Sequence, residues 1–555
     1  MLQTMSRRFE SYTVCVDEPY LCLLEGTASD RRNGNDIRYV FDARRRSLML
    51  TRDHWGQGTL YYCLKEDTLY FSSEIKALFA LGGIPVEPDK EGIVNNFVYL
   101  TPLSGRTVFR SVCRLEAGEC LKIENGKKSV GPAEEACRAD LFIADEAEAE
   151  RLVRDTIGKN VKETAALAAG EPIAVYLSGG LDSTIILREF ARLSDVPFEV
   201  FSLAFQNRSV TEKPFQDHVV AQIRAPYAYK HHTVWIDDAN MADFYEQTLR
   251  DVEMPFPKMN PVALSVLADA VRDAGISMVA TGEGADEMFY GYDFFKETAV
   301  RQKSLTLASE EEKDALIYAA YGSHAPLHEL KQYLLKHNDP GDPLYPLRPR
   351  YEASKAILPY VAGSFESLLE LAERELAEKL EGPRYHSVFE RCQKLIFLTL
   401  LPEYLVTQQA GQVLCNRRLD GAFAFINDNM YRLSLSLKDA YKLKDFEEKY
   451  ILKRAYRGEI PERILSRKKY QLTSPGAEVF LNGTQFEYLL SNISEENLRK
   501  EGIFSPQMVR ELAARLKKTP PRYSAGFDMD SYVFTYILST QMLFRIARSE
   551  WSLNR

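Results

Sequence analysis

A short apolar strand that runs directly into a glycine pair and then a helix is the feature that most restricts the fold of this chain. Residues 174–177 (Ala-Val-Tyr-Leu) have the composition of a buried strand in the middle of a parallel sheet. Ser178-Gly179-Gly180 follows, and the residues from Ser183 onward have the apolar spacing of a helix. Because two glycines lack Cβ atoms, successive backbone N–H groups in such a turn can point at one anion, next to a helix N-terminus. The segment predicts a phosphate-binding loop in a doubly wound α/β domain.

The residues of this loop resemble those of a known group of nucleotide-binding proteins. Ser178-Gly-Gly-Leu-Asp182-Ser183, after an apolar strand and before a helix, is similar to the loop of the PP-loop ATP pyrophosphatases. Members of that group bind the β- and γ-phosphates of ATP on the loop and release AMP and pyrophosphate. The loop is not a Walker A motif, because no Gly-Lys-Ser or Gly-Lys-Thr follows at the required spacing. The resemblance implies an adenine nucleotide alpha hydrolase-like domain in which ATP contacts Ser178, Gly179, Gly180, Asp182 and Ser183.

A second glycine-bearing turn follows another predicted buried strand, Ile-Ser-Met-Val-Ala. Its sequence is Thr281-Gly-Glu283-Gly-Ala-Asp286-Glu, and the glycines let the backbone approach a nucleotide. Because Mg²⁺ prefers one or two carboxylates together with phosphate oxygens, Asp182 and Asp286 are the predicted metal ligands. The two turns together resemble the asparagine synthetase family. That resemblance implies nucleotide contacts for Thr281 and Gly282 and a catalytic role for Glu283.

Residues 198–205 are a further predicted buried strand. In the family the corresponding strand end contacts the adenine base, so Leu177 and Leu203 are candidates for the walls of the nucleotide site. Plain core leucines are an equally good explanation of both. His231 and His232 are adjacent, and adjacent residues on a strand point to opposite faces, so they are expected to be structural rather than ligands of one metal ion.

Resemblance to the family returns near the carboxy-terminal end. Residues 449–455 and 460–475 are similar to its Lys-x-x-Leu-Arg-x-Ala, Leu-Pro and Arg-x-Lys-x-Gly-Phe-x-x-Pro series. Lys469 falls on the motif lysine, which implies that its ammonium reaches the α-phosphate or the tetrahedral intermediate. Loss of one such charge commonly lowers a rate by about 10²- to 10³-fold. Arg467 and Lys468 are expected to be solvated or structural.

Two departures from the family concern substrate recognition. Asp420-Gly-Ala-Phe-Ala-Phe-Ile-Asn has no arginine where the family has Glu-x-Arg-x-Pro-Phe-Leu-Asp, and Gln471 replaces a glycine. Residues 305–401 resemble the family little, and their composition predicts helices joined by proline-containing loops. A substrate-specific cover and a helical scaffold without substrate contacts remain open alternatives for that stretch.

The amino-terminal part alternates short apolar and polar runs, and segments beginning at residues 37, 47, 59 and 68 are predicted antiparallel strands. A small β-rich domain is therefore expected over residues 1–130. The synthetase-like domain is expected over residues 131–555, with a long amphipathic helix from Glu146 to about Ala169 leading into the phosphate strand.

This β-rich part resembles the carboxy-terminal half of the Ntn-type glutaminase domain of asparagine synthetases. Residues 52–62 match its Arg-Asp-x-x-Gly-x-x-x-Leu-Tyr-Tyr, residues 71–78 match its Ser-Glu-Ile-Lys segment, and residues 114–122 resemble the linker to the synthetase domain. A working glutaminase of this type needs cysteine as its first residue after Met removal, because that thiol attacks the glutamine amide. Residue 2 is Leu, and Cys15 and Cys22 are too far from the terminus to substitute. The expectation is a truncated remnant that keeps its fold without releasing ammonia from glutamine.

Composition excludes several classes of function. The 555 residues are 45% hydrophobic and 27% charged with a net charge of −9, which favours folded domains and argues against nonspecific nucleic-acid binding. No apolar run approaches the roughly 20 residues that span a bilayer, and the amino terminus lacks a secretory signal core, so a cytoplasmic protein without a membrane partner is expected. Eight cysteines without a Cys-x-x-Cys pair exclude the commonest zinc and redox patterns.

These observations predict an AMP-forming ligase. ATP and Mg²⁺ would bind at the two loops, a small-molecule or peptide carboxylate would attack the α-phosphate, and an amine would capture the acyl adenylate. The amine would be ammonia, a second substrate, or a group of the same molecule, as in β-lactam synthetases and lasso-peptide cyclases. Glutamate rather than tyrosine at position 283 favours the asparagine-like or another branch over lactam formation. A catalytically silent scaffold that binds a partner enzyme or a leader peptide is the alternative from another class, and a homodimer or a partner biosynthetic protein is left open.

Overall fold

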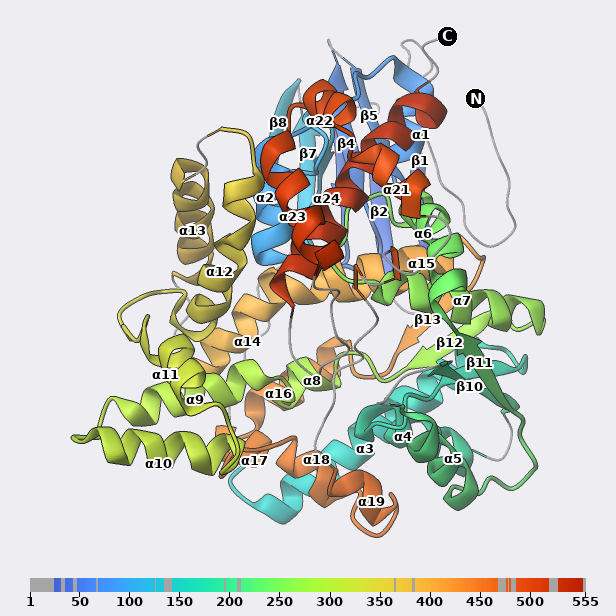
Figure 1. Ribbon diagram of the computed structural model, residues 1–555. Helices are drawn as coiled ribbons and strands as arrows, with labels where there is room; N and C mark the ends of the chain where they lie inside the picture. The colour runs from blue at the N-terminus through green and yellow to red at the C-terminus, as the bar shows by residue number, and fades with distance from the viewer. Residues whose placement is uncertain are drawn as a thin grey trace.

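The computed structural model of the chain describes most of the 555 residues. The described ranges are 24–30, 35–42, 47–65, 68–124, 126–133, 142–193, 196–206, 211–363, 366–381, 385–467, 476–477, 479–480, 486–518 and 528–552. Figure 1 shows the antiparallel strands and the last helices at one end of the molecule and the parallel sheet at the other, with a helical lobe, α9 to α13, at the side.

A five-stranded parallel sheet forms the centre of the larger part. Its order is β11-β10-β9-β12-β13, and every neighbouring pair is parallel. The strands are β9 (Ile173–Tyr176), β10 (Phe198–Phe205), β11 (His231–Ile236), β12 (Met278–Thr281) and β13 (Asp420–Phe423). The predicted strands around residues 174, 198 and 276 are therefore confirmed. The edge strand β13 was not predicted.

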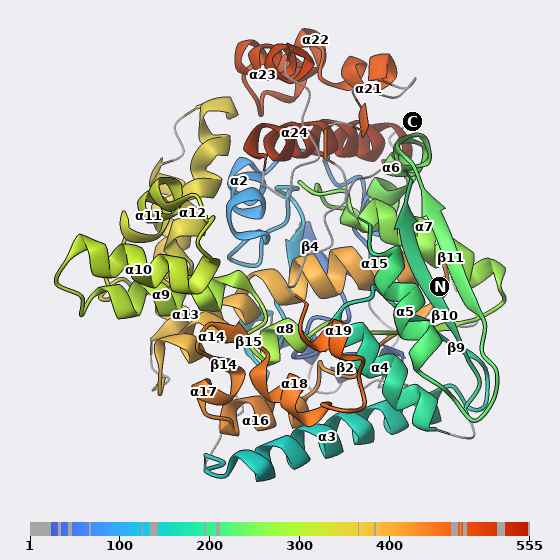
Figure 2. The ribbon, with the colours of Figure 1, turned by 60° about the horizontal axis from the view of Figure 1, so that its bottom comes forward.

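Alternate residues of the central strands enter two separate cores, which explains their continuous apolar character. On β9, Ile173 and Val175 pack into one core and Ala174 packs into the other. The first core is covered by α3 (Glu146–Leu167) and α4 (Leu181–Arg192), and the second by α6 (Asp238–Val252) and α7 (Asn260–Asp273). Figure 2 shows α3 along one outer edge of the molecule. Helices on both faces make the sheet doubly wound, as predicted.

The amino-terminal part consists of two small antiparallel sheets with the orders β1-β2-β3-β7-β8 and β5-β4-β6. Their strands are β1 (Leu24–Asp30), β2 (Asn35–Asp42), β3 (Ser47–Thr51), β4 (Tyr61–Lys65), β5 (Thr68–Ser72), β6 (Cys113–Arg114), β7 (Glu119–Glu124) and β8 (Lys127–Pro132). Antiparallel strands are confirmed here. The interpretation of residues 114–122 as a linker is wrong for residues 119–122, because β7 lies in the sheet between β3 and β8 and buries Cys120 and Leu121.

Helices account for most of the remaining chain. Up to residue 304, the helices not yet mentioned are α1 (Ile75–Gly82), α2 (Lys90–Tyr99), α5 (Lys213–Gln222), α8 (Ala285–Met288) and α9 (Asp293–Ser304). The stretch 305–401 is helical as predicted, with α10 (Glu310–Tyr321), α11 (Leu327–Leu335), η1 (Tyr345–Leu347), α12 (Arg348–Ser354), η2 (Lys355–Tyr360), α13 (Glu366–Leu380) and α14 (Val388–Leu398).

A π-helix, η3 (Leu400–Gly411), then runs through the middle of the molecule into α15 (Gln412–Cys415). The carboxy-terminal elements are α16 (Asp428–Ser436), α17 (Asp439–Lys442), β14 (Leu443–Lys444), β15 (Glu447–Glu448), α18 (Tyr450–Ala455), α19 (Glu462–Leu465), α21 (Phe486–Asn492), α22 (Glu495–Glu501), α23 (Pro506–Lys518), α24 (Met529–Ile546) and η4 (Ala547–Trp551). In the described ranges no helix is both long enough and apolar enough to cross a bilayer.

The two parts of the chain share one core. The Phe97 ring on α2 lies 5.1 Å from that of Tyr532 and 5.0 Å from that of Tyr536, both on α24. Figure 2 shows α24 lying across α2. The amino-terminal part is therefore packed against α24 of the synthetase part through buried aromatic side chains.

Candidate functional site

The first glycine turn joins β9 to α4 and is closed by its own hydroxyl groups. Ser183 Oγ donates to the Gly180 carbonyl at 3.2 Å and accepts from the Ser178 N–H at 3.2 Å, and Thr184 Oγ1 donates to Gly180 at 2.6 Å. Gly179 has φ +79°, and a Cβ there would lie 3.0 Å from Phe215 Cβ. Only glycine adopts this conformation freely, so the turn needs Gly179 for both its backbone angle and its close packing.

The second turn, at the end of β12, lies directly against the first. A Cβ on Gly282 would be 2.8 Å from the Ser183 nitrogen and 2.9 Å from the Asp182 carbonyl carbon. The absence of a side chain at position 282 is therefore what lets the two turns touch. The two carboxylates predicted as a metal pair come from these adjoining turns, and the structure brings them together on one cation.

That cation is Lys449, the residue immediately before α18. Its Nζ lies 2.6 Å and 2.5 Å from the two oxygens of Asp182 and 2.7 Å from Asp286 Oδ1, and its side chain is 5% exposed. Burial lowers the pKa of Lys449, but the carboxylates of Asp182 and Asp286 outweigh burial and raise it above its ordinary value. The lysine is charged and offsets one of the two negative charges of these acids.

Sequence reasoning assigned no role to Lys449, although it is the first residue of the Lys-x-x-Leu-Arg-x-Ala resemblance. Position in that motif was the only signal that could have found it. The predicted catalytic lysine, Lys469, lies outside the described residues, as do Lys468 and Gln471.

Acidic groups continue from the second turn toward α9. The Glu283 N–H donates to Thr281 Oγ1 at 3.3 Å, and the Glu283 side chain is half-buried. Glu287 is fully buried, and burial together with the charge of Asp286 raises its pKa. Tyr292 donates its hydroxyl proton to Glu287 at 2.7 Å. Glu283 is therefore partly accessible, while Glu287 is held inside by a hydrogen bond from Tyr292.

Arg467 packs against the first turn. Its guanidinium donates to the Gly179 carbonyl at 2.9 Å and to both oxygens of Glu212 at 2.7 and 2.9 Å, and it lies 3.9 Å from the Phe215 ring. Of the two alternatives predicted for Arg467, solvation is wrong, because the side chain is nearly buried. The arginine ties the phosphate turn to the segment that starts α5.

Leu177 and Leu203 are both buried, in the core under α3 and α4 and in the core under α7 respectively. Contact with a nucleotide stays a prediction for both. The histidines bond to different partners: His231 Nε2 lies 2.9 Å from Ser202 Oγ, and His232 Nε2 lies 2.6 Å from Glu199. Across the described part of the chain, no group of three or more His, Cys, Asp or Glu side chains is placed to hold a metal ion. The two histidines thus have separate side-chain partners, and their structural role stays a prediction.

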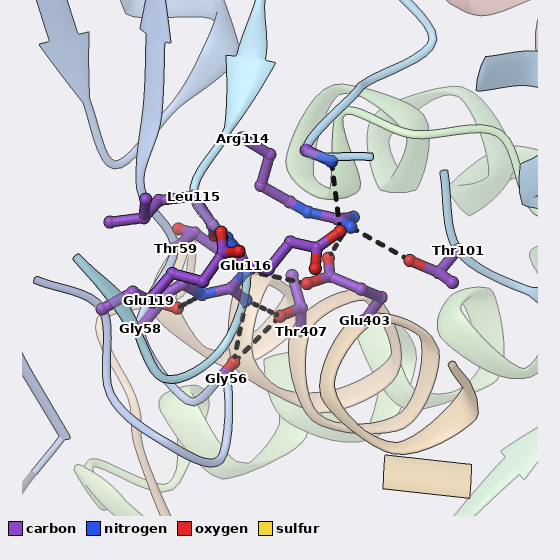
Figure 3. Close-up of polar contacts among 12 residues, drawn as sticks. Gly56, Gly58, Thr59, Thr101, Arg114, Leu115, Glu116, Glu119, Glu403 and Thr407 are labelled. Atoms are coloured by element: carbon purple, nitrogen blue, oxygen red, sulfur yellow. Dashed lines mark hydrogen bonds and ion pairs between the residues drawn. The ribbon is translucent and has the colours of Figure 1, made fainter. Parts of the chain in front are cut away.

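A second buried polar centre joins the β-rich part to η3 (Figure 3). Arg52 Nη1 lies 2.7 Å from one oxygen of Glu403, and Arg114 Nη1 lies 2.8 Å from the other. Arg52 also donates to Thr407 Oγ1 at 3.1 Å, and Arg114 donates to Thr101 Oγ1 at 3.1 Å. All three charged side chains are almost completely buried. The β-rich part therefore holds η3 through paired charges at its inner surface.

A doubly wound parallel sheet in which two neighbouring strands end in touching glycine turns, with two carboxylates on one lysine, defines a PP-loop nucleotide-binding enzyme. The family model described as asparagine synthase matches residues 152–543, and one described as a glutamine amidotransferase domain matches residues 27–133. The chain belongs to the asparagine synthase family. It is accordingly a carbon–nitrogen ligase that uses ATP to join a carboxylate and an amine.

Several named relatives are similar to most of the chain. The amidase chyE of Penicillium rubens is 25% identical over 479 residues, which are 78% of this chain and 68% of that protein. The amidase chry2 of Gibberella zeae is 24% identical over 480 residues, with the same two shares. The glutamine-hydrolyzing asparagine synthetase 3 of Bacillus subtilis is 22% identical over 458 residues, 79% of this chain and 67% of that protein.

Proposed function

We propose that this chain activates a substrate carboxylate with Mg·ATP at the two glycine turns and transfers the acyl group to an amine. The observation that supports this most directly is the placement of Lys449 between Asp182 and Asp286. An ammonium where two phosphate-binding turns meet suits the negative charge that builds up on a departing pyrophosphate, and the two carboxylates beside it suit Mg²⁺. Relatives named asparagine synthetase and amidase both concern amide bonds, which agrees with the proposal.

The donor set at the turns suits Mg²⁺. Asp182 and Asp286 already share one cation, the Lys449 ammonium, and Mg²⁺ takes one or two protein carboxylates together with phosphate oxygens. A bound Mg²⁺ would offset the negative charge of the triphosphate. The turn from Ser178 to Gly180, at the N-terminus of α4, would hold the outer phosphates. Lys449 would then stabilise the leaving pyrophosphate.

The reaction proposed for these residues has two steps. A carboxylate oxygen of the substrate forms a bond to the α-phosphorus while the α–β phosphoanhydride bond breaks and pyrophosphate leaves. The amine nitrogen then forms a bond to the acyl carbon while AMP leaves with the acyl oxygen. Glu283, half-buried at the edge of the second turn, would take the proton that the amine loses.

The source of the amine is proposed to be something other than glutamine. Glutamine hydrolysis requires an activated thiol. In the described portion of the β-rich part, Cys63 and Cys120 are buried and Cys113 on β6 is half-buried, and burial raises the pKa of the Cys63 thiol, which makes it a poor nucleophile. Ammonia, a second substrate or an amine of the same molecule are the proposed donors. We also propose that the boundary between the β-rich and synthetase domains lies near residue 130, at the end of β8.

Pyrophosphate release across a panel of carboxylates, with ammonia, glutamine or an amine present, tests the proposal. Asp182→Asn should reduce release by at least about 10²-fold, because one metal ligand and one lysine partner are lost together. Asp155→Asn, on the exposed surface of α3, is the matched control and should release pyrophosphate at the wild-type rate. Full activity of the Asp182 variant would contradict the assignment, and release of ammonia from glutamine would contradict the proposed amine source.

A further inference from the structure

A polar cavity lies between the last long helix of the chain and the short helices beside it. Its volume is about 300 Å³, and the residues that line it come from α21, α22, α24 and η4. Figure 2 shows α21 and α22 above α24 at the edge of the molecule. Every lining side chain is polar or charged. None of these elements carries a glycine turn, so the cavity is a feature apart from the proposed ligase site.

The spacing of the lining residues explains why two polar faces meet here. Gln541, Arg545 and Arg548 are separated by four and three residues, so they lie on one face of the helix that runs from α24 into η4. Asn497 and Lys500 are three residues apart on α22, and they share a face in the same way. Two polar helix faces therefore enclose the cavity, although most of α24 is buried in the core.

Two buried donor groups at this cavity have no acceptor in the described structure. Gln541 is 3% exposed, and its Nε2 forms no hydrogen bond with a described residue. The same is true of Arg545 Nε, while Arg545 Nη1 donates to the Tyr488 hydroxyl at 2.7 Å. A buried donor without an acceptor costs free energy. An acceptor atom inside the cavity would therefore stabilise both side chains.

The wall of the cavity carries three cations, Lys500, Arg545 and Arg548, and one acid, Glu501. Glu501 is bonded to Arg548, with 2.9 Å between Oε2 and Nη2. Lys500 is exposed and forms no hydrogen bond or ion pair with a described residue. The wall alone therefore has an excess of positive charge.

Acids behind the wall offset part of this excess. Glu246 on α6 lies 2.9 Å from Arg545 Nη2, but it also binds Arg250, and Arg250 is bonded in turn to Glu550. These two acids and two arginines neutralise one another. Glu496 on α22 is exposed and is not part of the wall. The charge of Lys500 is therefore left over at the cavity.

We propose that this cavity binds the phosphate group of a small organic phosphate. Lys500, Arg545 and Arg548 would offer N–H groups to its oxygens, and the Gln541 amide would offer one more. Charged N–H donors form the strongest hydrogen bonds to phosphate, and arginine suits it because of its planar fork. The cavity is about ten times the ~30 Å³ that one water molecule occupies in the liquid, so it has room for an organic part as well. The inference does not depend on the proposed ligase function.

Titration calorimetry of the full chain with three matched compounds tests the inference without turnover. The probes are glycerol 3-phosphate, glycerate and glycerol, and Mg²⁺ with adenosine 5′-(α,β-methylene)triphosphate is included to occupy the glycine turns. We expect glycerol 3-phosphate to bind at one site per chain, at least about 10-fold more tightly than glycerate, because phosphate accepts more charged hydrogen bonds. Glycerol 3-phosphate bound no more tightly than glycerol would overturn the inference, and glycerate bound as tightly would overturn the assignment to phosphate.

Two variants locate the site. Lys500→Gln and Gln541→Met should each weaken the binding of glycerol 3-phosphate by about 10-fold or more, the range for a hydrogen bond to a charged group. Phosphate bound at the glycine turns would be unaffected by either variant, and that result would overturn the inference. Arg499→Gln is the matched control on α22, because Arg499 pairs with Glu495 at the surface and does not line the cavity. The control should bind like the wild type.

Thermal melting separates binding from a structural role. Without ligand, Gln541→Met should melt at the wild-type temperature or above it, because the substitution removes a buried donor that has no partner. Glycerol 3-phosphate should raise the melting temperature of the wild type more than that of Gln541→Met, because bound phosphate would join α22 to α24. A lower melting temperature of Gln541→Met together with unchanged affinity would make Gln541 a structural residue and contradict its place in the site.

Discussion

The Lys449 ammonium lies within 2.6 Å of both carboxylate oxygens of Asp182, and this contact joins the carboxy-terminal region to the first glycine turn. Asp286 of the second turn approaches the same nitrogen at 2.7 Å. Three segments that are distant in the sequence therefore meet at a single buried charge. In the proposed reaction this charge would face the pyrophosphate as it leaves.

Replacing Lys449 by Met should lower the rate of pyrophosphate release by about 10²- to 10³-fold, the usual effect of removing one preorganised charge from a developing anion. Lys453→Met on the same helix is the control, because Lys453 pairs with Glu447 on the surface side. The Lys449 variant should also gain more thermal stability from Mg²⁺ than the wild type does, because two uncompensated carboxylates then bind the metal. An unchanged rate in the Lys449 variant would remove the main support for the proposed site.

Gly179→Ala should weaken ATP binding, measured as a rise in KM for ATP. The alanine would have to adopt φ near +79°, which costs roughly 1–2 kcal/mol for a residue with a Cβ, and that Cβ would press on Phe215. Gly170→Ala is a matched control, since Gly170 has φ +90° but nothing lies within 4 Å of its Cβ position. Both variants should lose some stability, and only the first should change KM. A similar KM in the two variants would contradict the placement of phosphate on this turn.

The parts of the fold that sequence predicted well are those encoded by local pattern. The strands β9, β10 and β12 are buried on both faces, so each is a continuous apolar run bounded by turn residues, and α3 shows helical spacing over its whole length. The strands β7 and β13 were missed. β13 is only four residues long and pairs with a strand from much earlier in the chain, so its partner rather than its own pattern makes it a strand.

The candidate site divides in the same way. Asp182 and Asp286 were predicted as a metal pair because each belongs to a glycine turn at a strand end and Mg²⁺ prefers carboxylates. The structure brings the two together on Lys449, and metal binding stays a prediction. Lys449 was missed, since it reaches the turns from the residue before α18, and local pattern says nothing about where a long side chain ends. Arg467 was predicted to be solvated or structural, and its contact with the first turn fits the second alternative.

Glu403→Gln should strongly destabilise the whole chain. Glu403 is the shared partner of Arg52 and Arg114, and removing one member of a buried charge network leaves two uncompensated cations, at a cost of about 3–5 kcal/mol. Because these arginines come from the β-rich part and Glu403 from η3, the loss should appear in one concerted thermal transition. Arg110→Gln, at an exposed pair with Glu87, should change stability by about 0–1 kcal/mol. A loss confined to the β-rich part, or comparable with that of the surface control, would contradict the role of the network.

The pH dependence of stability should contain a contribution from Lys442. This lysine is 2% exposed, lies 4.0 Å over the Tyr290 ring and donates to the Ser434 carbonyl, and burial lowers its pKa from 10.5 to about 8 despite the opposing charges of Asp439 and Glu390. Between pH 8 and 10.5 the unfolded chain therefore holds a proton that the folded chain has released. Stability contributed by this group rises as pH increases through that window and is lost as pH falls through about 8.

Lys442→Met isolates this contribution. The methionine variant has no buried charge at this position at any pH. Between pH 8 and 9.5 the free energy of unfolding of the wild type should therefore rise by about 2 kcal/mol relative to that of the variant, at 1.36 kcal/mol per pKa unit. Urea unfolding of both proteins at pH 7, 8, 9 and 9.5 measures the difference, and the range stays below the titration of most tyrosines. Lys438→Met, at an exposed position on the same segment, should show a difference from wild type that does not vary with pH. A stability difference between Lys442→Met and wild type that did not vary with pH would contradict the prediction. It would mean that the contacts with Tyr290 and Ser434 fully replace water around the ammonium, although a group with three donors is not satisfied by one ring and one carbonyl.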